Sequence, residues 1–359
     1  MQMKTNFKIA LVGFGIRGKQ WLKTIRKVKE LQFIGIVEND INKIDDCKKN
    51  LKNGEKIFSS LENLLKYQCD CIILATPPKI HFNHIKFLKD FAIDIICEKP
   101  LTESFQSSLE LKEIIKGANA ELIVGMNFRY LNTSNKYKSL IESKSLGNVG
   151  YGTFKYLRNR NPHRIDLNKY PIDMIQPMLL EQTIHHIDLM RYCYQSEVKD
   201  VTAQTWRVPW SLYTNDCSVS ILINFDNFHV NYIGTWTSGW NKLSFEWRTD
   251  FQKGIIIQKD QFANLNYVEF DSKISMTGKN FKTAKDAEVL KKIKMTQDKG
   301  LLSDTHKYLQ DYINYKLTGD RMQISLDDYL KSCAVIEACI ESKNKRKTID
   351  LTDYFKLIK

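Results

Sequence analysis

The stretch KIALVGFGIRGKQW, residues 8–21, decides the fold, because its glycines at positions 13, 15 and 18 form the pattern GxGxxG. Glycine-rich turns are common where a strand meets a helix, so the pattern indicates a dinucleotide site only in a particular context. A strand must precede it, a helix must follow it, and an acidic residue must end the next strand.

The sequence around the glycines meets all three conditions. Residues 7–12 are a short apolar run, typical of a strand that is buried on both faces of a parallel sheet. The next apolar run, residues 31–37, ends at Glu38, 20 residues after Gly18. Between the two runs, apolar residues recur at the three- and four-residue spacing of a helix face: Trp21, Leu22, Ile25 and Val28.

Each part of the pattern has an expected role in binding a dinucleotide. Gly13 makes the tight turn, Gly15 lets the backbone approach the pyrophosphate, and Gly18 allows close packing of helix and strand. Ile16 and Arg17 begin the helix, whose unpaired N–H groups and positive dipole end favour phosphates.

Glu38 bears on the choice between NAD and NADP. A carboxylate at this position accepts hydrogen bonds from the hydroxyls of the adenine ribose. A 2′-phosphate about 4 Å away would be repelled by roughly 4 kcal/mol per charge pair at an effective dielectric constant near 20. We therefore expect NAD, and NADP stays open because Lys43 is close enough in the sequence to offset the repulsion.

Length and composition describe a globular protein of two domains. The chain has 359 residues, more than a single core usually organises, and 43% of them are hydrophobic. The net charge is +13, but the lysines are scattered over predicted helix faces, so we expect no nucleic-acid partner. No stretch approaches the length of a membrane span, and no secretory signal with a small-residue cleavage site is present.

The eight cysteines indicate a reducing compartment. They form no CxxC pair, and Cys69, Cys71 and Cys97 lie in or beside apolar runs, where a buried thiol acts as a small hydrophobe. We expect a cytoplasmic protein.

The first 125 residues alternate apolar runs with helical patterns, which predicts a doubly wound parallel sheet, a Rossmann domain over residues 1–125. Further strands are expected near residues 55–58, 69–75, 92–98 and 120–125, and helices over roughly 60–67, 79–90 and 104–117.

Polar residues follow two of these predicted strands, at the carboxyl ends where ligands of such sheets bind. Thr76, Pro77 and His81 follow one strand, and Glu98 and Lys99 follow another. We expect all five to border the cofactor, although Thr76 fits the plain start of a helix equally well.

From residue 126 the pattern changes, and residues 126–359 are predicted as a second domain. Segments with period-two alternation begin near residues 151, 198, 216, 228 and 243, which predicts an antiparallel sheet with one covered face. Helices are expected near 133–143, 177–195 and from 300 onward, the last one capped by Ser325 with Asp328. We leave open whether the final helix packs back on the first domain.

The stretch EQTIHHIDLMRY, residues 181–192, is the most informative part of the second half. On a regular helix Glu181 lies beside His185, and His185 beside Asp188, because residues three and four apart are neighbours. A proton-transferring histidine oriented by carboxylates fits this face better than a metal site, since no second cluster at ligand spacing accompanies it. His186 points elsewhere, and we expect it to be packed.

Six motifs in this order resemble the glucose–fructose oxidoreductase, inositol dehydrogenase and rhizopine-catabolism (Gfo/Idh/MocA) family: GFGIRG, Glu38, TPPKIH, EKP, NFRY and the E-x-x-x-H-x-x-D block. The resemblance covers essentially the whole chain. It implies a Rossmann domain followed by an open antiparallel sheet whose covered face lines the active site. It also implies NAD(P)-dependent chemistry on sugars, polyols or related compounds such as nucleotide-sugars, in homodimers or homotetramers formed through the sheets.

The resemblance also assigns roles to residues. Lys99 matches the family's catalytic lysine and His185 its proton-transfer histidine. Glu181 stands where the commonest inositol-dehydrogenase-like pattern has Asp, so its reach grows by one methylene and substrate identity cannot be transferred. From the NFRY motif, we expect Asn127 to contact the cofactor and Arg129 the substrate.

The basic segment RNRNPHRIDLNKY, residues 158–170, contains further substrate candidates. Arg158, Arg160 and His163 suit a carboxylate or a phosphate, because arginine forks bind both, although a solvated surface loop explains the segment equally well. Trp236 is a candidate for stacking on a sugar ring, with core or oligomer packing as the alternative.

These predictions describe an oxidoreductase that moves a hydride between nicotinamide and a secondary alcohol. His185 accepts the hydroxyl proton, Glu181 positions His185, and Lys99 stabilises the charge on the oxygen. NAD-dependent glycoside hydrolases and eliminating enzymes on the same scaffold begin with the same step and stay open as alternatives. A non-catalytic dinucleotide-sensing regulator is a further alternative, and the presence of both Lys99 and His185 counts against it.

Overall fold

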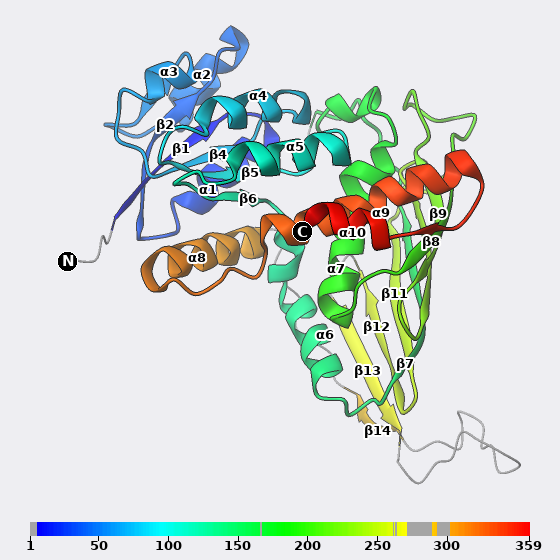
Figure 1. The fold of residues 1–359 in the computed structure, drawn as a ribbon. Coiled ribbons are helices and arrows are strands. Elements are labelled where there is room, and N and C mark those ends of the chain that lie inside the picture. The colour runs from blue at the N-terminus through cyan, green and yellow to red at the C-terminus, as the bar shows by residue number, and fades with distance from the viewer. Residues whose placement is uncertain (1–5, 166, 261, 263, 271–288, 293–301) are drawn as a thin grey trace, which may run out of the picture.

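The computed structural model describes residues 6–165, 167–260, 262, 264–270, 289–292 and 302–359. These residues form two sheets, one built from each half of the chain, with helices packed on them (Figure 1).

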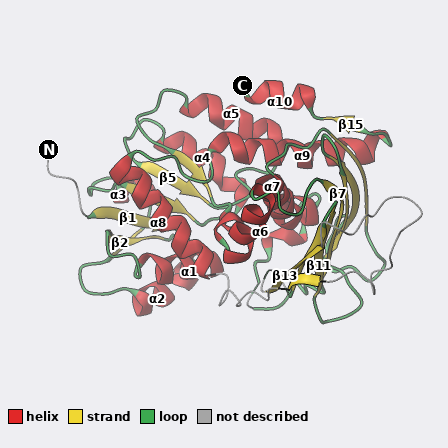
Figure 2. Ribbon diagram, turned by 90° about the horizontal axis from the view of Figure 1, so that it is seen from below, coloured by secondary structure: helices red, strands yellow, loops and turns green. Residues whose placement is uncertain are grey.

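The first sheet consists of six parallel strands: β1 (Phe7–Val12), β2 (Leu31–Val37), β3 (Lys56–Phe58), β4 (Cys71–Leu74), β5 (Asp94–Cys97) and β6 (Leu122–Val124). Their order is β3-β2-β1-β4-β5-β6, so the winding reverses beside β1 and the predicted doubly wound sheet is confirmed. Strands β4 and β5 are buried at every position, because helices cover both faces of the sheet (Figure 2).

Five helices connect these strands: α1 (Ile16–Ile25), α2 (Ile41–Asn50), α3 (Leu61–Leu64), α4 (Pro78–Leu88) and α5 (Phe105–Ile115). The sequence pattern does not predict α2, because Cys47 is the only buried residue on it and a single apolar position gives no periodicity. Helix α3 is shorter than the expected 60–67.

The second sheet has nine strands: β7 (Val149–Leu157), β8 (Asp200–Trp206), β9 (Ser218–Asn224), β10 (His229–Thr235), β11 (Ser244–Phe251), β12 (Gly254–Lys259), β13 (Asn264–Phe270), β14 (Val289–Lys292) and β15 (Ile349–Asp350). Their order is β14-β13-β12-β11-β7-β10-β9-β8-β15. Neighbours are antiparallel except for β7 and β10, which pair in parallel. Strands β12 to β14 escape the prediction; in β12, three consecutive isoleucines at 255–257 hide the alternation.

Helices α6 (Asn132–Glu142), α7 (Ile184–Tyr194) and α9 (Leu326–Lys345) lie on one face of the second sheet (Figure 1). A short 3-10 helix, η1 (Asn127–Tyr130), leads into α6, and a π-helical turn, η3 (Leu179–Thr183), leads into α7. The opposite face, which we call the open face, exposes Tyr151, Leu222 and Ile233.

Helices from the end of the chain join the two sheets. Helix α8 (Leu302–Thr318) packs on α1, and α9 packs on α5. The hydroxyl of Tyr329 on α9 accepts a hydrogen bond from the Leu101 N–H at 2.9 Å. The predicted cap of α9 is confirmed, because Ser325 Oγ accepts from the Asp328 N–H at 3.1 Å. A last helix, α10 (Thr352–Ile358), and a 3-10 turn, η2 (Tyr170–Ile172), complete the described elements.

The eight cysteines are buried and free, which includes the three expected to act as small hydrophobes, Cys69, Cys71 and Cys97. Within the described ranges, every helix is too short or too polar to cross a bilayer.

Candidate active site

A large cleft lies at the carboxyl ends of β1, β2, β4 and β5, and residues of η3, α7 and the end of β7 face them across it. Its volume is about 860 Å³, within the range of roughly 300–1,000 Å³ typical of small-molecule sites. Most of the predicted site residues line it: Gly13, Gly15, Ile16, Arg17, Glu38, Thr76, Pro77, Glu98, Lys99, Asn127, Arg158, Arg160, Glu181, His185 and Trp236. The predicted residues Gly18, His81, Arg129 and His163 are not part of this lining.

The three glycines of the first turn differ in what surrounds them. Gly13 has a φ of +89°, which favours glycine, and a Cβ there would meet the Thr76 methyl at 2.9 Å. A Cβ on Gly18 would lie 2.3 Å from the Gly13 carbonyl oxygen, so this glycine serves helix packing. A Cβ on Gly15 would have nothing within 4 Å, because this glycine borders the cleft. Gly15 is also the N-cap of α1, so no side chain occupies the start of the helix.

Glu38 is held in place by backbone donors. Its Oε2 accepts from the Phe14 N–H at 2.9 Å, and its Oε1 accepts from the N–H groups of Asn39 and Asp40, each at 3.1 Å. The Nζ of Lys43 lies 3.7 Å from Oε2. Glu38 therefore ties the end of β2 to the glycine turn and presents a fixed carboxylate to the cleft.

Glu98, at the end of β5, anchors the first turn of α1. Its Oε1 accepts hydrogen bonds from Arg17 Nε at 2.7 Å and from Trp21 Nε1 at 2.6 Å. Arg17 is thereby held at the edge of the cleft, where the phosphate-binding helix begins.

His81 does not reach the cleft, which corrects its prediction as a cofactor contact. Its side chain is fully buried, with Nε2 2.8 Å from the Thr76 carbonyl and Nδ1 3.2 Å from the carbonyls of Pro100 and Leu101. Burial lowers the pKa of His81 from its ordinary value. Because it sits one helical turn inside α4, His81 supports the two loops that carry Thr76 and Lys99 from behind.

Lys99 and Glu181 form an ion pair across the cleft. The Lys99 Nζ donates to Glu181 Oε2 at 2.9 Å and to the Glu181 carbonyl oxygen at 2.8 Å. The other carboxylate oxygen of Glu181 accepts from the Tyr170 hydroxyl at 2.8 Å. The lysine and glutamate side chains are only 13% and 8% exposed, so water screens the pair little.

His185 is buried beside this pair but is not bonded to it. Its ring stacks on Phe128, with centroids 4.3 Å apart, and its Nδ1 is buried without a hydrogen-bond partner among the described residues. Burial, and then the charge of Lys99, hold the pKa of His185 well below its ordinary value. The imidazole is therefore neutral near pH 7.

The predicted orientation of His185 by Glu181 is wrong, because both carboxylate oxygens of Glu181 are taken by Lys99 and Tyr170. The expectation assumed a regular α-helix, in which residues four apart are neighbours. Glu181 instead belongs to the wider π-helical turn η3, a kind of turn that is frequent at functional sites. His186 is packed as expected, with Nδ1 2.9 Å from the Tyr232 hydroxyl.

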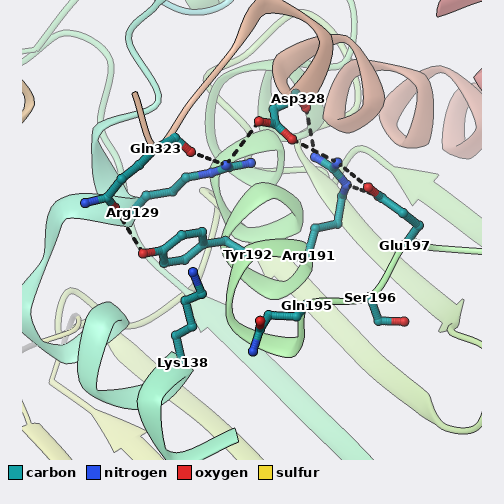
Figure 3. A pocket seen from close by; sticks show the side chains of 9 residues that line it. All are labelled: Arg129, Lys138, Arg191, Tyr192, Gln195, Ser196, Glu197, Gln323 and Asp328. Carbon is teal, nitrogen blue, oxygen red and sulfur yellow. Dashed lines mark hydrogen bonds and ion pairs between the residues drawn. The ribbon is translucent and has the colours of Figure 1, made fainter. Parts of the chain in front are cut away.

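Arg129 is not a cleft residue, which corrects its prediction as a substrate contact. It forms a bidentate pair with Asp188, from Nε to Oδ2 at 2.9 Å and from Nη2 to Oδ1 at 2.7 Å. Arg129 lines a separate cavity of about 300 Å³. Figure 3 shows it there with Arg191, Glu197 and Asp328. The charges there pair with one another, so this network joins η1, α7 and α9, and both carboxylate oxygens of Asp188 are bonded to Arg129.

The basic segment divides into a part that lines the cleft and a part that does not. Arg158 and Arg160 line it, whereas His163 is exposed outside the lining. The end of the segment returns to the cleft, which Asn168, Lys169 and Tyr170 line although the sequence does not single them out as site residues. No helix or strand spacing in the sequence indicates Tyr170 as a site residue, since its hydrogen-bond partner Glu181 is eleven residues further along the chain.

Arg160 is fixed against an aromatic ring. Its guanidinium lies 4.4 Å from the centre of the Trp236 ring, and its Nη1 donates to the Tyr213 hydroxyl at 2.7 Å. Arg160 Nη2 donates to the Asn168 carbonyl at 3.3 Å. These contacts bring three distant segments of the second domain to one end of the cleft.

Asn127 lines the cleft and is held by a residue from the end of the chain. Its Nδ2 donates to Asp304 Oδ2 at 2.6 Å, and the Asp304 side chain is fully buried on α8. Burial raises the pKa of Asp304 to about 7. No local pattern around Asp304 announces this contact.

The geometry defines a class of protein. Three features at the edge of the parallel sheet form a dinucleotide site. They are the positive-φ glycine after β1, the N-terminus of α1 without a side-chain cap, and the fixed carboxylate of Glu38 after β2. The chain is a dinucleotide-binding α/β protein whose cleft is completed by a second, mostly antiparallel domain.

Two family models match this chain: an oxidoreductase family with an NAD-binding Rossmann fold at residues 7–126, and the GFO/IDH/MocA C-terminal domain at residues 135–256. The chain belongs to the Gfo/Idh/MocA family of oxidoreductases, and its first domain is an NAD-binding Rossmann fold. The family, the fold class and the cofactor expected from the sequence are thus confirmed.

Three relatives share the architecture or the family at low sequence identity. Inositol 2-dehydrogenase of Mycolicibacterium gilvum is 22% identical, over 55% of this chain and 55% of its own length. D-Apiose dehydrogenase of Rhizobium rhizogenes is 21% identical, over 97% of this chain and 98% of its own length. An oxidoreductase from Agrobacterium radiobacter, solved with NAD+, L-tartaric acid and magnesium, is 18% identical and has a TM-score of 0.81, covering 97% of this chain and 99% of that one.

Proposed function

We propose that this protein transfers a hydride between the nicotinamide of NAD and a secondary alcohol of a sugar, a polyol or a nucleotide-sugar. The observation that carries the proposal is the Lys99–Glu181 pair beside a neutral His185, in the same cleft as the dinucleotide turn. The dehydrogenases of inositol and D-apiose among the relatives support the substrate class.

The residues around the first turn fit NAD. Gly15 and the first N–H groups of α1 would receive the pyrophosphate, and Glu38 would accept hydrogen bonds from the ribose, since a carboxylate has about four acceptor positions and three are used. Thr76 borders the cleft, and we assign it to the cofactor; its Oγ1 has no hydrogen-bond partner among the described residues. When bound, NAD supplies the group that exchanges hydride with the substrate.

Lys99 would polarise the reacting oxygen. An ammonium group has three donors, and Glu181 occupies two of them. The third is left for the substrate oxygen, whose developing negative charge a nearby cation stabilises.

His185 would accept the hydroxyl proton during oxidation. A base must be unprotonated to act, and the lowered pKa of His185 keeps its imidazole neutral near pH 7. Since Nδ1 is buried, we assign Nε2 to the substrate. Glu181 and Tyr170 act through Lys99, whose position they fix.

The experiment combines cofactor binding with turnover. Purified protein is titrated with NADH and with NADPH, and then screened with sugars and polyols while NADH formation is followed. We expect tighter binding of NADH, turnover by the wild type, and loss of turnover with retained NADH binding in Lys99→Met. Turnover by Lys99→Met would remove Lys99 from the mechanism, and substrate conversion without net NADH formation would favour a glycoside hydrolase or eliminating enzyme.

We further propose that the open face of the second sheet joins copies of this chain in a homodimer or homotetramer. It exposes Trp206, Tyr151, Leu222 and Ile233, which are 38%, 51%, 40% and 40% accessible. Light scattering coupled to size exclusion tests this, and a monomer at micromolar concentration would contradict it.

Two further expectations stay proposals. We place the division between the domains at residues 125 and 126, which limited proteolysis tests. We place the protein in the cytoplasm, which eight free and buried thiols support and cell fractionation tests.

A further inference from the structure

One end of the cleft carries two arginines with more side-chain donors than acceptors, because among the described residues Arg158 bonds the Tyr156 hydroxyl alone and Arg160 has two acceptors. Arg158 and Arg160 are two residues apart on an extended segment, so their side chains lie on the same face. The Arg160 N–H bonds to the Trp236 carbonyl at 2.8 Å, which places Trp236 opposite. The indole Nε1 of Trp236 is buried without a partner among the described residues.

The charges that line the cleft do not balance at this end. All four described carboxylates of the lining have a cation: Glu38 and Asp40 have Lys43, Glu98 has Arg17, and Glu181 has Lys99. The cations Arg158, Arg160 and Lys169 line the same cleft and form no ion pair with any described carboxylate.

Arg160 is built into the site rather than free in solution. Arg160 is only 8% exposed, and its guanidinium stacks on Trp236. Two of its N–H groups donate hydrogen bonds, one to the Tyr213 hydroxyl and one to the Asn168 carbonyl. A buried guanidinium without a carboxylate is costly, because removing a charge from water requires compensation. A bound anion provides that compensation.

Arg158 and Arg160 belong to the same half of the cleft as Glu181, the half that the second domain contributes. Arg160 holds Asn168, and Tyr170, two residues further along the chain, donates to Glu181, which holds Lys99. The dinucleotide turn, with Gly15 and Arg17, belongs to the other domain.

We propose that the substrate carries an anionic group, a carboxylate or a phosphate, which Arg158 binds together with Arg160. Arg158 is the specificity-determining residue, since Arg160 has fewer free donors. The inference rests on the proposed function, because it names the substrate class of the same cleft.

The test measures the binding of matched pairs of compounds to the protein saturated with NADH, by titration calorimetry. One pair is D-glucuronate and D-glucose, which differ by a carboxylate; the other is D-glucose 6-phosphate and D-glucose. We expect the charged member of at least one pair to bind about tenfold tighter or more, as a charge-assisted bidentate contact gives. Preference in the first pair identifies a carboxylate, and preference in the second a phosphate.

Arg158→Gln should reduce the preference, taken as the ratio of the two affinities in the same variant, to less than about threefold. Lys86→Gln, on the exposed end of α4, removes the same charge away from the cleft and should leave the preference unchanged. Arg158→Lys should keep only part of it, because an ammonium lacks the fork.

Equal binding within both pairs, no binding of either anion, or a preference that survives Arg158→Gln would overturn the inference. NADH binding and hydride transfer are measured separately. A protein that oxidises neutral sugars without preference loses only this inference, whereas one that binds the anions through Arg158 but never forms NADH loses only the proposed reaction.

Discussion

The ammonium of Lys99 lies 2.9 Å from a carboxylate oxygen of Glu181, across the boundary between the two sheets. Lys99 follows β5 of the parallel sheet, and Glu181 lies in the π-helical turn before α7. The pair therefore joins the half of the cleft that contains the dinucleotide turn to the half that the second domain contributes, and it fixes the cation that the proposed reaction needs.

Replacing Glu181 with Gln should lower kcat by roughly 100-fold and change KM little, because Lys99 loses its charged partner and its fixed position. NADH binding should be unaffected. Steady-state kinetics and an NADH titration check this, and Glu181→Asp should recover part of kcat. A change in KM alone would show that Glu181 binds the substrate instead of positioning Lys99.

The pH profile of oxidation should reflect the environment of His185. Its pKa is held well below the ordinary 6.5 by burial and by Lys99, so the neutral base persists below pH 6.5. We expect kcat/KM to stay constant as pH falls from 8 to about 6.5 and to decline only below that value. A midpoint at or above pH 6.5 that disappears in His185→Asn would contradict the buried, neutral imidazole.

Alanine substitutions at Gly15 and Gly18 should affect different properties, NADH binding in the first and folding stability in the second. Gly18→Ala places a methyl 2.3 Å from a backbone oxygen and should cost about 1–3 kcal/mol of unfolding free energy. Gly15→Ala meets no atom within 4 Å, so stability should hold while NADH binding weakens. Urea unfolding and NADH titration of both variants test this; equal NADH affinity in Gly15→Ala would place the pyrophosphate elsewhere.

Glu38→Ala should raise the Kd for NADH by about 10- to 100-fold, as expected for loss of hydrogen bonds to a charged group. It should also narrow the difference between NADH and NADPH, since the repelling carboxylate is gone. Asp45→Ala is the control, because it removes the same charge from an exposed position of α2 that is not part of the cleft lining. An unchanged ratio of the NADH and NADPH dissociation constants in Glu38→Ala would mean that Glu38 only holds the glycine turn in place and does not contact the ribose.

Asp304 should make stability fall as pH rises. Burial raises its pKa in the folded protein to about 7 from 3.8, so between those values the folded state holds a proton that the unfolded state releases. The unfolding free energy should therefore decrease from about pH 4 to 7, by at most about 1.4 kcal/mol per pH unit, and level off above pH 7. The difference between wild type and Asp304→Asn, measured by urea unfolding at several pH values, should show this slope. A pH-independent difference would mean that Asp304 is ionised throughout.

The local sequence predicts the first domain well, because its signals are short in range. The turn at Gly13, the packing of Gly18 and the buried strands each depend on neighbours within about one βαβ unit. Helix α2 escapes prediction for the same reason, since Cys47 alone faces the core.

The second domain is predicted less completely. Alternation reveals β7 to β11 but says nothing about their order, so the parallel pairing of β7 with β10 appears only in the structure. The three consecutive isoleucines of β12 do not alternate with polar residues, so the sequence pattern does not indicate a strand there.

The sequence by itself determined the dinucleotide turn, the residues at the ends of the parallel strands and the family, because each depends on residue type at fixed spacing. The tertiary structure alone decided the partners. Arg129 pairs with Asp188, and His81 hydrogen-bonds the loop carbonyls. Glu181 accepts hydrogen bonds from Lys99 and Tyr170. Spacing along a chain limits which side chains are neighbours on one element, but a charge buried between elements pairs with whichever opposite charge the packing brings within reach.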